Sequence, residues 1–196
     1  MKRISIYFVI ASIFCIACNH QSKTKDNAKN IYYDKAFDYR EEGLTDSAFK
    51  YFNRAKDLFL SRQDKFGAGK CLVNMAIIST AKNDNYGGQE LALQAIAFFN
   101  VKDKKQHVYL SSNYNNLGIA SYNIGDYQDA LQFYDLAIKY SPSAAKTRMY
   151  LNNMANIYAD RAIKLLEQNK DCFISNKDKI FFNRDTLRNI PSYMNK

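Results

Sequence analysis

The chain is poor in the residues that most often carry metal or acid–base chemistry. Its 196 residues include two histidines, His20 and His107, and neither has a cluster of possible partners beside it. Because a metal site needs several histidine, cysteine or carboxylate ligands that converge, the sequence predicts no metal site. A catalytic triad, a redox motif and a cofactor loop are also missing, so we expect no catalytic residues and no cofactor. The composition therefore argues against an enzyme.

One short segment comes close to a phosphate-binding loop. The string FGAGKC contains Gly69 and Lys70 in the order that such loops use. However, Asp64 stands where the first glycine belongs, and Cys71 replaces the Ser or Thr hydroxyl that meets magnesium. We therefore interpret this segment as the beginning of a helix.

Long apolar runs are missing as well. The longest run covers residues 4–17 and follows Lys2 and Arg3. Its length is below the roughly 20 residues that a transmembrane helix needs. A short basic region before an apolar run of this size is typical of a secretory signal, which we assign to residues 1–17.

What the chain does contain is an internal repeat. The clearest copy lies in residues 115–142, NNLGIASYNIGDYQDALQFYDLAIKYSP, where small or aromatic residues lie 12, 16 and 19 positions after Gly118. The same offsets counted from two earlier alanines again reach small or aromatic residues. The three copies are Ala36, Ala48, Phe52 and Ala55; Ala76, Gly88, Ala92 and Ala95; and Gly118, Ala130, Tyr134 and Ala137. Their starts lie 40 and 42 residues apart, and a fourth start at Ala155 follows after 37, a period typical of helical solenoids.

Each repeat is predicted to be a helix, a tight turn and a second helix. In the clearest copy, Tyr114, Leu117 and Ser121 share one helical stripe, residues 124–127 (IGDY) form the turn, and a second stripe follows. Small residues where the helices cross let the axes approach to roughly 8–10 Å, while the aromatic residue fills the groove beside them. Pro142 lacks an amide donor and is predicted to end the second helix.

This pattern resembles the tetratricopeptide repeat over roughly residues 29–160. The third copy matches closely. In the second copy, Ala92 takes the place where the family prefers an aromatic residue, so we expect thinner packing there. The resemblance implies an all-α fold, a right-handed superhelical solenoid of antiparallel helix pairs. It implies about three full repeats and a capping helix within residues 29–168.

The fourth copy keeps only its first helix. Residues 146–168 contain neither glycine nor proline, so we predict one long helix that caps the array. Residues 169–196 lose the repeat pattern and are predicted to be a partly ordered tail. The buried side of the capping helix is expected to carry Met149, Met154, Ile157, Ala162 and Leu165, and the apolar tail residues that can dock on it are Ile180, Phe181 and Phe182.

The residues that end the apolar run, FCIAC, resemble a bacterial lipobox. This resemblance implies cleavage before Cys18, lipid attachment to Cys18 and a place in the bacterial cell envelope, on the periplasmic side or the outer-membrane surface. Residues 18–28 are polar and are predicted to be a flexible tether. An ordinary cleaved signal with an incidental cysteine is the alternative.

The four cysteines do not predict a disulfide framework. Cys15 lies in the predicted signal and Cys18 is the predicted lipid site, which leaves Cys71 and Cys172. These two can bond only if the C-terminal end of the array folds back on it. We interpret Cys71 as a small apolar residue of a helix.

Lysine and arginine outnumber aspartate and glutamate by 28 to 19, which gives a net charge of +9. The basic residues are scattered, and export would separate the chain from nucleic acid, so no nucleic-acid partner is predicted. A solvated surface near anionic lipid or an acidic partner accounts for the excess.

In tetratricopeptide repeats, the first helix of each pair lines the concave side, where peptides or partner helices bind. Helical spacing then nominates the candidate groove residues Tyr33, Phe37, Arg40, Asn115, Tyr122, Asn152 and Asn156, with Val73, Ile77 and Thr80 in the second unit. An amide side chain can both donate to and accept from a peptide backbone. For Asn115, Asn152 and Asn156, ligand contact and plain solvation are equal alternatives.

Another set of asparagines recurs one residue before Met75, Leu117 and Met154. This regular place predicts a structural bond between helices for Asn74, Asn116 and Asn153. The carboxylate-clamp subgroup of the family uses a Lys and Asn pair where this chain has Tyr33 and Phe37, so recognition of an acidic chain terminus is not expected.

Two functions are compatible with these features. The first is a non-catalytic protein- or peptide-binding scaffold, anchored by lipid, that serves as an adaptor in cell-envelope assembly or signalling. The second rests on the likeness of residues 83–96, NDNYGGQELALQAI, to sensor arrays of Bacteroidota-type regulators, where such repeats precede a membrane helix and an output module. The chain would then be the shortened sensor portion of a transcriptional regulator or histidine kinase. The sequence does not predict the oligomeric state.

Overall fold

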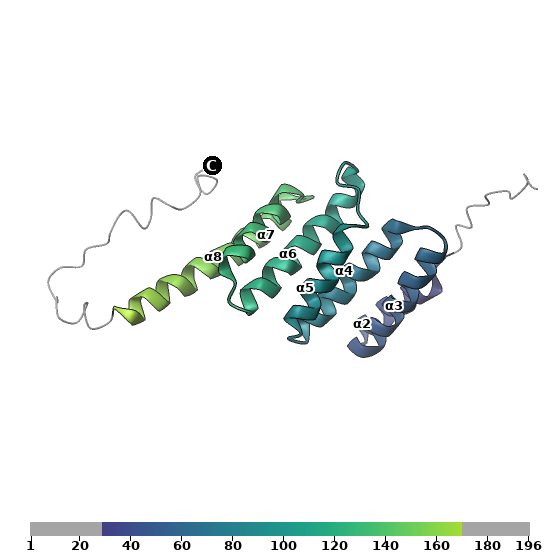
Figure 1. Ribbon diagram of the computed structural model, residues 1–196, viewed down its shortest axis with the longest axis horizontal. Coiled ribbons are helices and arrows are strands. Elements are labelled where there is room, and N and C mark those ends of the chain that lie inside the picture. The colour runs from purple at the N-terminus through teal and green to yellow at the C-terminus, as the bar shows by residue number, and fades with distance from the viewer. Residues whose placement is uncertain (1–28, 170–196) are drawn as a thin grey trace, which may run out of the picture. The chain divides into compact units, whose positions relative to one another are not determined.

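A computed structural model describes residues 29–169 (Figure 1). Residues 1–28, with the predicted signal and tether, and residues 170–196, with Cys172 and the predicted tail, lie outside the described residues, so the predictions made for them are not tested. Within the described range, the chain forms seven α-helices, one short 3-10 helix and no strand. They are α2 (Ile31–Glu41), α3 (Thr45–Ser61), α4 (Lys65–Ala81), α5 (Asn85–Ile96), η1 (Lys104–Gln106), α6 (His107–Asn123), α7 (Tyr127–Lys139) and α8 (Ala144–Gln168).

The helices pack as consecutive pairs, α2 with α3, α4 with α5 and α6 with α7 (Figure 1). Each second helix also packs against the first helix of the next pair, and α4 contacts α6, which in turn contacts α8. The first helices α4, α6 and α8 therefore form a continuous layer. This arrangement is an all-helical solenoid of repeated pairs, as the sequence predicted.

A three-residue turn joins the two helices of each unit, and its middle residue has a positive φ. This residue is Gly43 in the first unit, Asn83 in the second and Gly125 in the third, with φ of 76°, 65° and 85°. Glycine and asparagine are the residues that enter this left-handed region most readily. The turn predicted at residues 124–127 is thus confirmed, and the other two units repeat it.

Three aspartates cap helices that follow three-residue turns, namely α4 after the turn from α3, and α5 and α7 within their units. The carboxylate of Asp64 accepts the backbone N–H of Gly67 at 2.8 Å, and Asp84 and Asp126 accept the equivalent N–H groups of α5 and α7. The first amides of a helix have no partner inside it, so these bonds stabilise the helix starts. Because α4 begins at Lys65, the interpretation of FGAGKC as a helix beginning is confirmed.

The repeat offsets mark the places where helices cross. The alanines at these offsets are fully buried, and so are the two aromatic residues Phe52 and Tyr134. A Cβ atom built on Gly118 would lie 2.5 Å from Cε1 of Tyr134, well inside van der Waals contact. The lack of a side chain at Gly118 therefore sets how closely α6 and α7 approach.

The second unit obtains its aromatic packing differently. A Cβ atom on Gly88 would lie 2.2 Å from Oγ1 of Thr80, so α4 and α5 lie close together. Phe98 and Phe99, which follow α5, also lie close to Gly69 of α4. A Cβ atom built on Gly69 would lie 2.9 Å from Phe98 and 3.1 Å from Phe99. Phe99 and Ala92 belong to the same core cluster, so the segment after α5 contributes aromatic packing to this unit.

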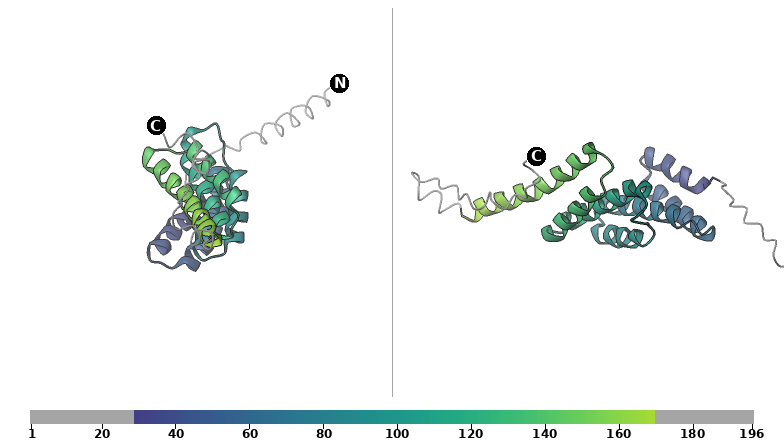
Figure 2. Two further views of the ribbon diagram at one scale, coloured as in Figure 1. Left: turned by 90° about the vertical axis from the view of Figure 1, so that its left-hand side faces the viewer. Right: turned by 90° about the horizontal axis from the view of Figure 1, so that it is seen from above.

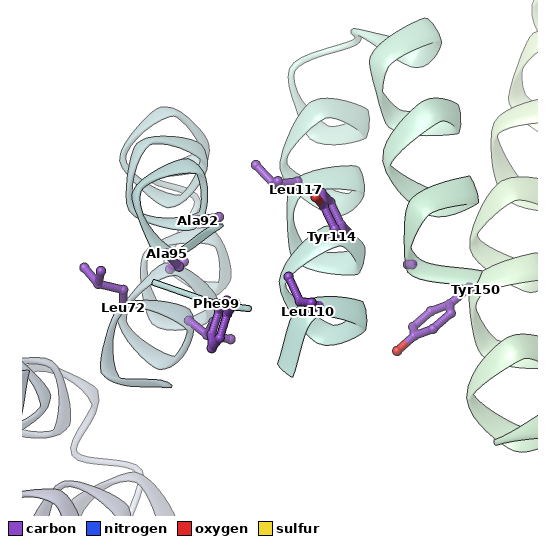
Figure 3. Packing of buried hydrophobic residues seen from close by; sticks show 11 residues of the cluster. Leu72, Ala92, Ala95, Phe99, Leu110, Tyr114, Leu117 and Tyr150 are labelled. Atoms are coloured by element: carbon purple, nitrogen blue, oxygen red, sulfur yellow. The ribbon is translucent and has the colours of Figure 1, made fainter. Parts of the chain in front are cut away.

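The largest core cluster joins successive units. Figure 3 shows Leu72 of α4 and Phe99 on one side, with Leu110, Tyr114 and Leu117 of α6 beside them, and Tyr150 of α8 beyond. Leu110, Leu117 and Tyr150 are fully buried. Because each unit buries its apolar surface against its neighbours, the array holds together as a stack.

α8 is the single long helix that the sequence predicted, but its predicted buried side is only partly right. Its buried residues are Tyr150, Met154 and Ile157, whereas Met149, Ala162 and Leu165 are exposed. Every residue from 161 to 168 is exposed. The reason is that α8 packs on α7 and α6 as far as Asp160, which accepts a hydrogen bond from Tyr122 of α6, while residues 161–168 extend past them (Figures 1 and 2). A sequence stripe alone does not reveal where the neighbouring helix ends.

Candidate interaction surface on the first helices

The seven predicted groove residues all lie on first helices, but their surroundings differ. We call the side of α2, α4, α6 and α8 that carries them the first-helix face. From α2 to α8 it includes Tyr33, Phe37, Arg40, Asn115, Tyr122, Asn152 and Asn156.

Tyr33 and Phe37 are part of an aromatic cluster and are only partly exposed on the surface. Their ring centroids lie 5.0 Å apart, and both rings meet Phe52 edge-on at 5.8 and 5.2 Å. Both residues are half-buried, and burial raises the pKa of the Tyr33 hydroxyl above its ordinary value. Edge-to-face contacts of this kind stabilise a core, so only part of each ring is left for a partner.

Arg40 is exposed but already engaged. Its Cζ lies 4.3 Å from the centroid of the Phe37 ring, and its Nη1 donates to Oδ1 of Asn74 at 2.7 Å. This bond connects α2 to α4. Arg40 therefore helps to join the first two units and is not a freely available cation.

Lys70 of α4 is a residue that the sequence reasoning missed. Its ammonium nitrogen lies 4.8 to 5.9 Å from the centroids of four aromatic rings, Tyr33, Phe59, Phe66 and Tyr109. These rings come from α2, α3, α4 and α6, so one cation contacts side chains of three units. Cation–π attraction and packing of its aliphatic stem both favour this position. No local sequence signal points to it, because the rings are far apart in the chain.

Asn74, Asn116 and Asn153 have the structural role that was predicted. Each shares a side-chain hydrogen bond with the preceding first helix: Asn74 accepts from Arg40, while Asn116 donates to Thr80 Oγ1 at 3.3 Å and Asn153 donates to Asn115 Oδ1 at 2.8 Å. One polar bond thus repeats at each junction between first helices. Such bonds satisfy polar groups within the layer and fix its register.

Asn115 and Tyr122 also contribute to this layer. Asn115 accepts the bond from Asn153, and the Tyr122 hydroxyl donates to Oδ2 of Asp160 on α8. Both residues are half-buried. Because these polar groups already pair within the protein, any partner would meet them as part of a preformed surface.

Asn152 and Asn156 of α8 are different, since both side chains are exposed. They lie four residues apart and therefore one helical turn from each other on the same side. Of the seven nominated residues, these two present the most accessible amides.

The second unit contributes little to this surface. Only 2% of Val73 and 5% of Thr80 is exposed to solvent, so the expectation that they contact a partner is wrong. Val73 packs in the core, and Thr80 pairs with Asn116. Ile77 is half-buried and is the only one of the three that reaches the surface appreciably.

Metal ligands and the buried thiol are two further features of the described residues. No group of three or more His, Cys, Asp or Glu side chains among them could hold a metal ion. Cys71 is fully buried, and that burial raises its pKa to about 12, as suits a small apolar core residue. Within residues 29–169, no helix is both long and apolar enough to cross a membrane.

Comparison with known families identifies a repeat within the array. A family model described as "Tetratricopeptide repeat" matches residues 111–144, which cover most of α6, the turn and α7. This is the copy that carries the repeat pattern most clearly in the sequence. A search of curated proteins gives no match. The chain thus contains a tetratricopeptide repeat within an array of similar helix pairs.

Proposed function

We propose that this protein is a non-catalytic scaffold that binds a protein or peptide on its first-helix face. Tetratricopeptide repeats generally bind proteins or peptides, and the match at residues 111–144 is the observation that supports this proposal most directly. The stack of helix pairs supplies a rigid surface, because each layer is fixed by buried alanines and by repeated asparagine bonds.

We assign Asn152 and Asn156 as the main contact residues for the partner. Their exposed amides offer donors and acceptors to a partner's backbone. Tyr33, Phe37 and Arg40 form the other end of the surface, where aromatic edges and a cation are partly accessible. Asn115 and Tyr122 lie between these ends and contribute mainly by holding α6 against α8.

Site-specific photo-crosslinking tests this proposal. A photoreactive amino acid is placed at Asn156 on the first-helix face, or at Gln132, an exposed residue of α7, as the matched control. We expect a discrete protein adduct from position 156 that is absent from position 132. Identical adduct patterns from both positions would contradict binding on the first-helix face.

We further propose that the chain is a lipoprotein, anchored in a bacterial cell envelope through Cys18 and acting there as an adaptor. The basic start, the apolar residues 4–17 and the sequence FCIAC support this proposal. A single acyl chain binds a membrane only weakly, so stable anchoring needs more than one chain or an additional charge attraction. Loss of Lys2 and Arg3 with residues 1–17 lowers the net charge from +9 to +7, which fits the latter.

Metabolic labelling with an alkyne fatty acid tests the anchor separately from the binding surface. Label should enter the wild-type chain and be lost in Cys18→Ser, while Cys71→Ser keeps it. Equal labelling of wild type and Cys18→Ser would exclude Cys18 as the lipid site.

A further inference from the structure

A cluster of tyrosine rings and cations lies across α2 and α3, the first helix pair (Figure 1). The ring centroids of Tyr39 and Tyr51 are 5.0 Å apart, and the Tyr32 centroid lies 6.2 Å from that of Tyr51. The ammonium nitrogen of Lys35 lies 5.3 Å from the Tyr51 centroid, and Cζ of Arg54 lies 5.2 Å from it. Two cations from different helices therefore converge on one aromatic ring. We call these five residues the tyrosine-cation patch.

The two cations of the patch have no ion-pair partner among residues 29–169. Both side chains are exposed, and no carboxylate oxygen of a described residue lies within 4.0 Å of their nitrogen atoms. By contrast, Lys56 pairs with Asp57 and Lys82 pairs with Asp46. Two like charges over one ring create a positive local potential, so an anion is favoured at this place.

The pKa of Tyr51 is affected by the same surroundings. The Tyr39 hydroxyl lowers the pKa of Tyr51 below its ordinary value, and the charges of Lys35 and Arg54 lower it further, although desolvation acts in the opposite direction. A negative charge on the Tyr51 oxygen is thus favoured where the two cations converge.

The hydrogen-bonding groups of the patch suit an anion with several oxygen atoms. Ammonium and guanidinium groups only donate, and a tyrosine hydroxyl can donate as well. A phosphate group accepts several such bonds at once, and arginine can bind it through two parallel N–H groups. The chemistry of the patch therefore fits a phosphate group.

The patch lies on a different side of α2 from the first-helix face. Tyr32, Lys35 and Tyr39 recur at intervals of three and four residues, so they share one side of the helix. Each precedes a residue of the first-helix face by one or two positions, and successive helical residues point about 100° apart. A ligand on the patch therefore leaves the first-helix face free for a partner.

We propose that the tyrosine-cation patch binds the phosphate headgroup of an anionic phospholipid and holds the first unit against a bilayer. The choice of a lipid as the source of the phosphate rests on the proposed anchor, since Lys35 follows Cys18 by 17 residues. This length of chain spans at most roughly 60 Å, so an anchored protein keeps the patch at a high effective concentration near headgroups. Lysine and arginine are attracted to anionic bilayers, and tyrosine is enriched at the level of the headgroups.

Vesicle sedimentation tests the patch without the anchor. The full chain carries Cys18→Ser in every sample, so that no lipid is attached there. Binding is measured to vesicles of phosphatidylcholine alone and to vesicles of an equal mixture with phosphatidylglycerol. The patch variant is Lys35→Gln with Arg54→Gln. The matched control is Lys102→Gln with Lys104→Gln, which removes the same charge at two exposed positions outside the patch.

We expect the patch variant to bind the mixed vesicles roughly tenfold more weakly than the unsubstituted chain, because basic residues act only close to the bilayer surface. The control variant should lose no more than about twofold. Equal losses would show that only the net charge matters and would overturn the proposal. Equal binding of the unsubstituted chain to both kinds of vesicle would also overturn it. These results do not depend on lipid attachment at Cys18, which metabolic labelling tests separately.

Inorganic phosphate distinguishes a soluble anion from a lipid. Calorimetry measures its binding to the unsubstituted chain and to the patch variant. Binding of free phosphate that the patch variant loses, together with equal vesicle binding of the two chains, would assign the patch to a soluble anion. The lipid assignment would then be wrong.

A second measurement leaves the patch intact. The fluorophore NBD, which emits more strongly in a less polar environment, is attached to Ser47→Cys, one turn before Tyr51 on the same side of α3, or to Gln132→Cys on α7. Every native cysteine except the buried Cys71 is replaced by serine. Emission should increase with the mixed vesicles at position 47 but not at position 132. An equal response at both positions would contradict contact through the first unit.

Discussion

The ring of Tyr134 lies against Gly118 so closely that a Cβ atom on this glycine would be 2.5 Å from the ring. Tyr134 is almost fully buried and cannot swing into solvent without leaving its core cluster. We predict that Gly118→Ala lowers the free energy of unfolding. Overpacking costs about 1–3 kcal/mol, and this outweighs the gain of up to about 1 kcal/mol that alanine brings to a helix interior. Urea unfolding at 25 °C measures the change.

A double-mutant cycle separates this contact from a general effect on α6. In a Tyr134→Leu background the ring is absent, so Gly118→Ala should cost clearly less than in the wild type. An equal loss in both backgrounds would show that the added methyl group is not opposed by the ring.

The turn of the third unit makes a second prediction. Gly125 has a φ of 85°, where alanine is strained, so Gly125→Ala should destabilise the protein by about 1 kcal/mol. Gly125→Asn should cost less, because Asn83 holds the equivalent place in the second unit with a φ of 65°. Chemical denaturation compares the two variants, and a more stable Gly125→Ala would refute the turn geometry.

Asn113 makes a third prediction. This side chain is fully buried, and its Nδ2 donates to the carbonyl oxygen of Ala92 at 2.8 Å, which ties α6 to α5. Asn113→Ala should cost about 1–3 kcal/mol, since it removes a buried hydrogen bond and leaves a cavity. The matched control Asn152→Ala, at an exposed position, should change stability by less than about 0.5 kcal/mol. Equal effects of the two substitutions would contradict the assigned burial.

The sequence predicted these features unevenly. The helix pairs, the crossing residues and the turn at Gly125 follow from local spacing, and so does the recurrence of Asn74, Asn116 and Asn153. The ring cluster around Lys70 does not, because it joins residues as distant as Tyr33 and Tyr109 through the packing of separate units.

The candidate surface was predictable in position but not in accessibility. Helical spacing placed Val73 and Asn152 on first helices alike, yet Val73 is buried and Asn152 is exposed. The difference arises because α4 has neighbouring units on both sides, whereas no unit follows α8 among the described residues. Burial along a solenoid therefore depends on a helix's place in the array, which a single repeat does not encode.

The thiol of Cys71 makes a fourth prediction. Burial raises its pKa from the ordinary 9.0 to about 12, so the neutral thiol is the favoured form in the folded protein. At pH 8 the thiolate fraction, and hence the reaction with Ellman's reagent, should be roughly a thousandfold lower than for a free thiol. The associated stability is fully present below pH 9 and is lost as the pH rises toward 12.

The measurement uses a chain with Cys15, Cys18 and Cys172 replaced by serine, so that only Cys71 reacts. Addition of denaturant should restore the reaction to the rate of an unfolded thiol. Fast labelling at pH 8 without denaturant would show that Cys71 is accessible in the folded state.

The central claim is that the first-helix face binds the partner, and one affinity comparison tests it most directly. The partner is the protein identified through crosslinking at position 156, and its Kd is measured by calorimetry for two double variants. Asn152→Ala with Asn156→Ala should weaken binding by roughly tenfold or more, because it removes two exposed amides at the proposed contact. Gln128→Ala with Gln132→Ala, exposed on α7, should leave the Kd within about twofold of wild type. An unchanged Kd for the asparagine pair, or an equal loss for the glutamine pair, would contradict the claim.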